Sequence, residues 1–268
     1  MSEINLLKDN LEKYPNIKTL INEKDIDKWT KKLAGYTNPI NDYILNSKFN
    51  ILTSLILENT NDFAKNLAIF FETSLKIFPQ LLDSDTFKRN IKSLDDFAFI
   101  SFLSELTLSK YLKGFDFNIS FNSDYQKIKK GDIISKDIDI VAKHNNGQNI
   151  NFEIYTPNSE SDINGFFDLP ALGEKFEKKI KVKEYDKFEG MISGQLNGKV
   201  LLAINYAYDD NFNIYLTASN SKFFIKMEDY IHHEIDGILL FHHDIAKDKS
   251  LHICRLIIKQ PLTMANKA

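Results

Sequence analysis

The spacing of apolar residues changes at Gly114, and this change constrains the fold more than any other feature of the sequence. Before it, apolar residues recur at helical spacing and no strand-like alternation is present. After it, residues 115–121 (FDFNISF) alternate between apolar and polar, which is typical of a strand with one buried face. The sequence therefore predicts helices first and a sheet afterwards.

The first third of the chain is predicted to be a helical bundle over residues 1–90, and residues 91–268 are predicted to form a second domain. Prolines fall between the predicted helices, where they interrupt no helical hydrogen bond. A further long helix is expected over residues 94–113, and Gly114 should end it. Nothing in the first 90 residues indicates chemistry, so Trp29 and the phenylalanine cluster Phe63, Phe70, Phe71 and Phe78 are assigned to the core.

From residue 94 onwards the predicted order is α-β-β-β-α-β followed by α-β-β. This alternation predicts an α/β (α+β) domain with a mixed sheet. The expected segments after the first strand are a polar connection (123–132), a hairpin (137–157), a charged helix (169–195), a strand (199–208), a short helix within 223–235, and two strands (237–245 and 251–259).

The hairpin segment, DIDIVAKHNNGQNINFEIYTP, runs from Asp137 to Pro157 and has one apolar and one mostly polar face on each arm. If the apolar sets share the core, the polar sets must share the opposite face, because side chains alternate strictly along a strand. A three-residue loop ending at Gly147, with positive φ at that glycine, satisfies this condition and places His144 opposite Gln148.

The same register places Asp139 opposite Glu153 and Asp137 opposite Tyr155, with opposed Cβ atoms about 4.5–5.5 Å apart. Two facing carboxylates repel each other unless a cation lies between them. A magnesium or manganese ion is the natural candidate, because hard divalent cations take carboxylate oxygens. The alternative is a solvated sheet face, where water weakens the repulsion and no metal is needed.

The order of elements and the motif DIDI…NFEIYTP resemble the PD-(D/E)xK nuclease-like (restriction-endonuclease-like) superfamily over about residues 94–206. The resemblance implies an αβββαβ core, a Mg²⁺ or Mn²⁺ cofactor and cleavage of nucleic acid. Asp137 or Asp139 matches the first acidic position of the motif, and the register favours Asp139. Glu153 matches the second, and Glu105, in the preceding helix, matches the glutamate that family members often carry there.

The motif lysine of that family is missing, because Tyr155 stands where it would be. A tyrosine, with an ordinary pKa near 10, cannot supply its positive charge. A lysine from the next helix is the expected substitute, with Lys183 as the catalytic candidate. The lysines of that helix recur every four residues and form one stripe. The stripe, which is also the predicted nucleic-acid contact, consists of Lys175, Lys179, Lys183 and Lys187.

Two functions follow from these residues. The first is a metal-dependent nuclease that binds nucleic acid, DNA in preference to RNA, with catalytic Glu105, Asp139, Glu153 and Lys183 and metal ligands Asp137, Asp139 and Glu153. The second is a catalytically inactive protein of the same fold that binds nucleic acid or a protein partner, which Tyr155 favours. A third alternative is an α/β domain whose similarity to the family is accidental.

Composition limits the remaining classes. The net charge of -3 argues against a dedicated nucleic-acid packaging protein but allows a local basic patch. No apolar run approaches the length of a membrane span, so no membrane association is expected. The single cysteine cannot form an internal disulfide, which favours a cytoplasmic location. A homo-oligomer is compatible with the sequence, which does not determine the oligomeric state.

Overall fold

The computed structural model describes residues 3–34, 50–93, 96–157, 169–206, 231, 234–243 and 251–258. The chain divides into two compact units, each described by itself. The first comprises residues 1–106 with 244–249, and the second comprises 107–243 with 250–268. Helix α8 continues from the first into the second. The predicted domains, residues 1–90 and 91–268, stay a prediction.

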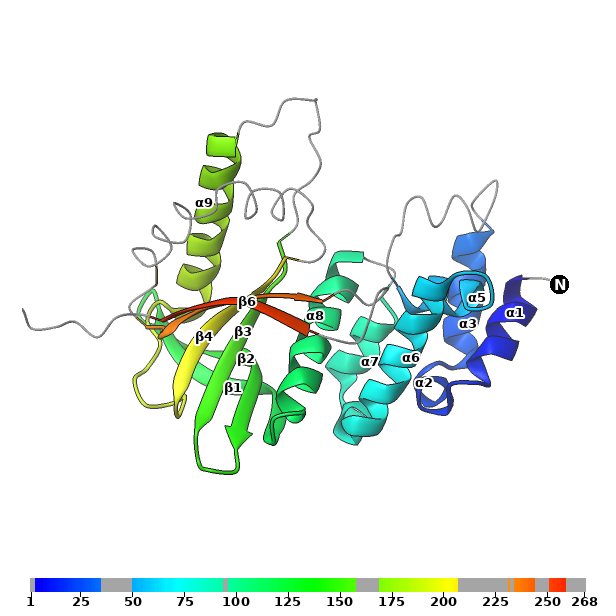
Figure 1. The fold of residues 1–268 in the computed structure, drawn as a ribbon, viewed down its shortest axis with the longest axis horizontal. Coiled ribbons are helices and arrows are strands. Elements are labelled where there is room, and N and C mark those ends of the chain that lie inside the picture. Colours follow the sequence, from blue (N-terminus) through cyan, green and yellow to red (C-terminus); the bar gives the residue numbers. More distant parts are fainter. Residues whose placement is uncertain are drawn as a thin grey trace, which may run out of the picture. The chain divides into compact units, whose positions relative to one another are not determined.

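The first unit is helical, as its apolar spacing predicts (Figure 1). Several of its helices begin with a side-chain cap, such as Asn22, whose side chain accepts from the backbone of Asp25 in a capping box. Trp29, Phe71 and Phe87 are fully buried in its core. The elements are α1 (Glu3–Leu11), α2 (Pro15–Leu20), α3 (Glu23–Leu33), α5 (Ile51–Leu57), α6 (Asp62–Ile77), the short 3-10 helix η1 (Pro79–Asp83), α7 (Asp85–Ile91) and α8 (Asp96–Lys113).

The second unit is built on one mixed sheet whose strands lie in the order β1-β2-β3-β4-β5-β6 within the described residues. Strands β1 to β3 pair antiparallel, β3 to β5 pair parallel, and β6 returns antiparallel to β5. The elements are β1 (Phe117–Lys129), β2 (Asp132–His144), β3 (Asn149–Tyr155), α9 (Leu169–Phe188), β4 (Lys199–Asn205), β5 (Gly237–His243) and β6 (Leu251–Ile258). The mixed α/β fold, with helices before strands, is confirmed.

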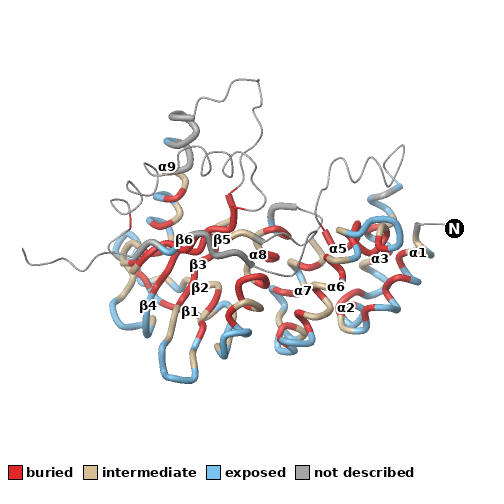
Figure 2. Tube along the Cα trace, in the orientation of Figure 1, coloured by how far each residue is buried: buried red, intermediate tan, exposed pale blue. Residues whose placement is uncertain are grey.

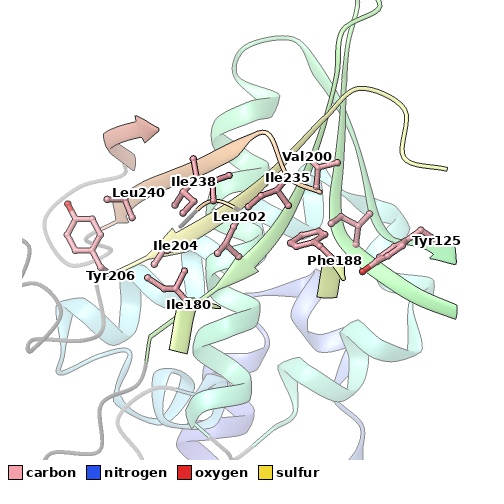
Figure 3. Packing of buried hydrophobic residues seen from close by; sticks show 12 residues of the cluster. Tyr125, Ile180, Phe188, Val200, Leu202, Ile204, Tyr206, Ile235, Ile238 and Leu240 are labelled. Carbon is pink, nitrogen blue, oxygen red and sulfur yellow. The ribbon is translucent and has the colours of Figure 1, made fainter. Parts of the chain in front are cut away.

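A helix packs against each face of this sheet. Leu108 and Leu112 of α8 join one apolar cluster with residues of the sheet such as Ile140 and Phe152. The opposite cluster contains Ile180 and Phe188 of α9 (Figure 3). Its core members around α9 are Ile180, Phe188, Val200, Leu202, Ile204, Ile238 and Leu240. Most residues of the central strands β3 and β4 are buried (Figure 2).

The polar segment 123–132, predicted as a connection, is instead part of a long β1–β2 hairpin, so that prediction is wrong. Its register runs without a shift down to Lys129 opposite Asp132. Lys130 and Gly131 form the turn with φ of 54° and 90°, as the primed two-residue turns of hairpins require. The alternation was hidden because a two-stranded ribbon needs no continuous apolar face.

Helix α9 ends at Phe188, whereas the sequence predicted its end near residue 195. Gly190 follows with φ of 74°, in the left-handed region that ends many helices. The chain then runs beside β1, where the N–H of Ile128 donates to the carbonyl of Gly190 and the N–H of Ile192 donates to that of Gln126. Most of the predicted short helix within 223–235, namely residues 223–230 and 232–233, lies outside the described residues.

Replacing Gly190 by alanine is expected to destabilise the protein by about 2–5 kcal/mol, because two costs add. An L-residue is strained at this φ, and a Cβ here would overlap the carbonyl oxygen of Ile128. Gly194→Ala is the matched control, since Gly194 has φ of 83° with open space around it, and should cost about 1–2 kcal/mol. Urea unfolding measures both, and equal losses would contradict the close approach to β1.

Candidate active site

The hairpin of β2 and β3 has the predicted register. Ile140 pairs with Phe152 and Ala142 with Ile150. At the loop, the N–H of His144 donates to the carbonyl of Gln148 at 2.8 Å, and Gly147 has φ of 90°. Extending this register by one residue places Asp139 opposite Glu153, as the alternation of polar residues predicted.

Asp139 lies where the regular pairing of β2 is interrupted on both sides. The β1–β2 register passes from Phe121 opposite Ile140 directly to Ser123 opposite Ile138, and the intervening Asn122 has φ of 50°. The backbone N–H of Ile154 donates instead to the Asp139 carboxylate, with 2.6 Å between N and Oδ2. The register is the same on both sides of this point, so no residue is inserted, and the Asp139 carboxylate serves as the acceptor for the N–H of Ile154.

Glu153 is the most buried acid of the site, with a side-chain exposure of 0%. Two ammonium groups from α9 contact its Oε1, that of Lys183 at 2.8 Å and that of Lys187 at 2.9 Å. The side chains of Lys183 and Lys187 are 30% and 14% exposed. Both ammonium groups are therefore largely shielded from water where they contact Glu153 of β3. Two lysines of this helix, Lys183 and Lys187, thus reach Glu153, and their predicted roles stay predictions.

The second oxygen of Glu153 has a different environment. Both oxygens are buried and neither makes a regular hydrogen bond among the described residues, but the ammonium contacts given above are to Oε1, not to Oε2. A buried carboxylate oxygen without a partner is costly, because its lone pairs lose water and gain nothing in return. This oxygen therefore marks the position where a further cationic or donor group would be stabilised.

The charges around this pair shift two pKa values. Burial, together with the nearby charge of Glu153, raises the pKa of Asp139 to about 7, although Lys187, the N–H of Ile154 and Lys183 oppose the rise. Burial alone would lower the pKa of Lys187, but the carboxylates of Glu153, Asp139 and Asp137 outweigh it and raise that pKa, so this lysine stays charged. Near neutral pH the site therefore holds a charged lysine beside an aspartate that is only partly ionised.

Two side chains of β1 fix the end of α9 that carries Lys187. The hydroxyl of Tyr125 donates to the backbone carbonyl of Lys187 at 2.6 Å, and the Nζ of Lys127 donates to that of Asp186 at 2.7 Å. Carbonyls in the last turn of a helix have no partner within the helix, so these contacts act as a cap. Sequence reasoning missed both residues, because they lie in the segment taken for a polar connection.

Tyr125→Phe is expected to destabilise the protein by about 1–2 kcal/mol, the cost of a partly buried carbonyl left without its donor. The ring should stay packed, since Tyr125 is almost fully buried and belongs to the α9-side cluster. Urea unfolding measures the loss. Tyr185→Phe, on the exposed face of α9, is the control and should change stability by less than about 0.5 kcal/mol. Equal stability of Tyr125→Phe and wild type would exclude the capping role.

The other predicted residues occupy different positions. Asp137 is half-buried, and Lys187 contacts its Oδ1 at 3.6 Å and its backbone carbonyl at 3.4 Å. Tyr155 is partly buried and packs against the α9-side cluster. Lys179 is half-buried, and the side chain of Lys175 lies outside the described residues. Glu105 is half-buried on α8 within the first unit, so its convergence with the carboxylates stays a prediction.

The donor set has the chemistry for a hard cation but is small. Asp139 and Glu153 offer carboxylate oxygens, and Oε2 of Glu153 is without a hydrogen-bond partner among the described residues. In the part of the chain that the structure describes, no group of three or more His, Cys, Asp or Glu side chains is arranged to hold a metal ion. Mg²⁺ is commonly bound through one or two carboxylates, with water and substrate phosphate completing its coordination, so the residues fit that ion.

Comparisons with known proteins give little information about the family or function of the chain. No family model matches it, and no curated protein matches it. The solved structure of Pyrococcus furiosus SfsA in complex with Ca²⁺ is similar at 13% sequence identity and a TM-score of 0.24. The match covers 60% of this chain and 64% of that one, which is less than two thirds of its length. This is a weak structural similarity. Among the described residues, no helix has the length and apolar character of a membrane span.

Proposed function

We propose that this protein is a metal-dependent nuclease that hydrolyses nucleic-acid phosphodiesters at the Asp139–Glu153 pair. One observation carries the proposal: Glu153 is fully buried, and its Oε2 has no hydrogen-bond partner among the described residues, beside a second carboxylate whose pKa is raised. A folded protein keeps such an arrangement at a cost in stability, and strongly perturbed carboxylates of this kind concentrate at functional sites.

Asp139 and Glu153 would hold Mg²⁺ or Mn²⁺. Such an ion, when bound, lowers the pKa of a bound water and polarises a phosphate oxygen. The chain's own contribution is positive charge, because Lys183 and Lys187 bring two ammonium groups to Glu153 where the motif lysine is absent. Either ammonium is suited to orient an attacking water and to offset charge on the phosphate.

The compensated charge of the two carboxylates favours a second function, that of a non-catalytic binding protein. Lys183 and Lys187 already compensate Glu153, and Asp139 takes up a proton near neutral pH, so little negative charge is left to attract a cation. These features suit a non-catalytic protein that binds nucleic acid or a protein partner.

A cleavage assay on DNA and RNA with Mg²⁺ or Mn²⁺ separates the two functions. The proposal predicts metal-dependent cleavage, with DNA preferred, and a loss of at least about 100-fold in Glu153→Gln. Glu174→Gln is the matched control, because it makes the same change on the exposed face of α9 and should retain full activity. Absence of cleavage with either metal on every substrate, or equal cleavage by Glu153→Gln, would contradict it and favour the binding protein.

A further inference from the structure

Two ammonium groups of α9 share one oxygen of Glu153. Lys183 and Lys187 contact Oε1 at 2.8 Å and 2.9 Å, so their ammonium groups lie within about 6 Å of each other. Two positive charges this close repel each other, and the repulsion is stronger where water is largely excluded. The pair is therefore held in place by the negative charge of the neighbouring carboxylates.

The two lysines are held to different degrees. Besides Glu153, the ammonium of Lys187 contacts Oδ1 of Asp137 at 3.6 Å and the backbone carbonyl of Asp137 at 3.4 Å. The backbone of Lys187 is fixed as well, because its carbonyl accepts from the hydroxyl of Tyr125. Lys183 is about twice as exposed as Lys187, and among the described residues it forms no ion pair besides that with Glu153. Lys183 is therefore the less firmly held of the two.

The charge balance of the site leaves little room for an added cation. Three carboxylates act on Lys187, those of Glu153, Asp139 and Asp137. When all three are ionised, they carry three negative charges against the two positive charges of Lys183 and Lys187. One negative charge is left over, whereas Mg²⁺ or Mn²⁺ carries two positive charges. An ion added to this set would leave an excess positive charge away from water unless one ammonium group moved out.

We propose that Lys183 is an exchangeable counter-ion: its ammonium neutralises Glu153 while no ion is bound and moves toward solvent when a divalent cation binds. Lys187 stays in place and supplies fixed positive charge. The long, flexible stem of a lysine allows this movement without a shift of α9. This inference rests on the proposed function, because it takes the Asp139–Glu153 pair as the place where the ion binds.

Acetylation of lysines measures the release of Lys183 directly in the wild-type chain. The full chain is treated briefly with an amine-acetylating reagent at about pH 8, in EDTA or in millimolar Mn²⁺, and each lysine is assayed by mass spectrometry. An amine paired with a buried carboxylate reacts slowly. Mn²⁺ should therefore raise the labelling of Lys183 at least about threefold and leave that of Lys187 and of the exposed Lys178 within about 1.5-fold. Glu153→Gln, which removes the partner charge, should show the higher labelling of Lys183 already in EDTA.

Removal of the exchangeable charge should also strengthen the binding of the ion. Lys183→Met should lower the Kd for Mn²⁺, measured by calorimetry, about tenfold, because the ion no longer has to displace an ammonium group. This variant keeps Lys187 at Glu153, so the buried carboxylate stays compensated. Lys178→Met is the matched control, since it makes the same change at an exposed position of α9, and should leave Kd within about twofold.

Unchanged labelling of Lys183 in a wild-type chain that binds Mn²⁺ would overturn the inference, as would release of Lys187 in its place. A Kd for Lys183→Met equal to or higher than that of the wild type would also overturn it. The two measurements separate this inference from the proposed function. A chain that binds Mn²⁺ and cuts DNA with Lys183 still protected refutes the inference alone. A chain that binds Mn²⁺ and releases Lys183 but never cuts refutes the nuclease alone.

Discussion

Asp139→Asn is expected to raise the free energy of unfolding at about pH 8 by up to about 4 kcal/mol and to flatten its dependence on pH. The pKa of this aspartate rises from 3.8 to about 7 on folding. Between these values the folded chain holds a proton that the unfolded chain has lost, so raising the pH favours unfolding. Wild-type stability should fall from about pH 4 to pH 7, and the two proteins should converge near pH 4.

Urea unfolding across this pH range measures the effect, and Asp139→Ala is the informative companion. Asparagine keeps an oxygen that accepts from the N–H of Ile154, whereas alanine leaves that N–H without its acceptor. The alanine variant should therefore show the same flat pH profile but be less stable than the asparagine variant by about 1–3 kcal/mol. A pH profile of Asp139→Asn that follows the wild type would show that Asp139 is not the group responsible.

Removing both lysines of the site should have the opposite effect. Lys183→Met/Lys187→Met leaves Glu153, which is fully buried, without the two ammonium groups at its Oε1. Breaking a buried ion pair on one side costs about 3–5 kcal/mol, because a charge is left uncompensated away from water. Methionine retains much of the apolar stem of lysine, so packing is largely conserved and the loss reports on charge.

The triple variant that adds Glu153→Leu supplies the control. Replacing a complete buried ion pair with apolar side chains is often neutral or stabilising, so most of the lost stability should return. Thermal or urea unfolding of the three proteins measures this. A double variant as stable as the wild type, or a triple variant less stable than the double, would contradict the view that Glu153 is a compensated buried anion.

Much of the site was predictable from the sequence because strict alternation leaves few choices. Apolar residues on both arms of the β2–β3 hairpin fix which residues share a face, and the turn at Gly147 fixes the register. These two constraints are enough to place Asp139 opposite Glu153. The four-residue spacing of the lysines likewise predicted that positive charge would follow one side of α9.

The remaining features depend on contacts between distant segments, which local patterns do not encode. The spacing of the lysine stripe does not say which members contact Glu153. Lys183 and Lys187 are the two that do so. Hydrogen bonds from Tyr125 and Lys127, and the close approach of Gly190 to β1, fix the position of the C-terminal end of α9 relative to β1. The far end of the β1–β2 hairpin was missed for a related reason. Its stability comes from pairing and from attachment to α9, and its exposed isoleucines disguise the alternation on which strand prediction relies.

The central claim, that Asp139 and Glu153 form a metal site, is tested most directly by isothermal titration calorimetry with Mn²⁺ at about pH 8, where Asp139 has lost its proton. The wild-type chain should bind one ion, and Asp139→Asn/Glu153→Gln should bind none. Lys130→Gln, at the turn between β1 and β2, should bind as the wild type does. Absence of binding heat at millimolar Mn²⁺, or binding that survives in the carboxylate variant, would contradict the claim.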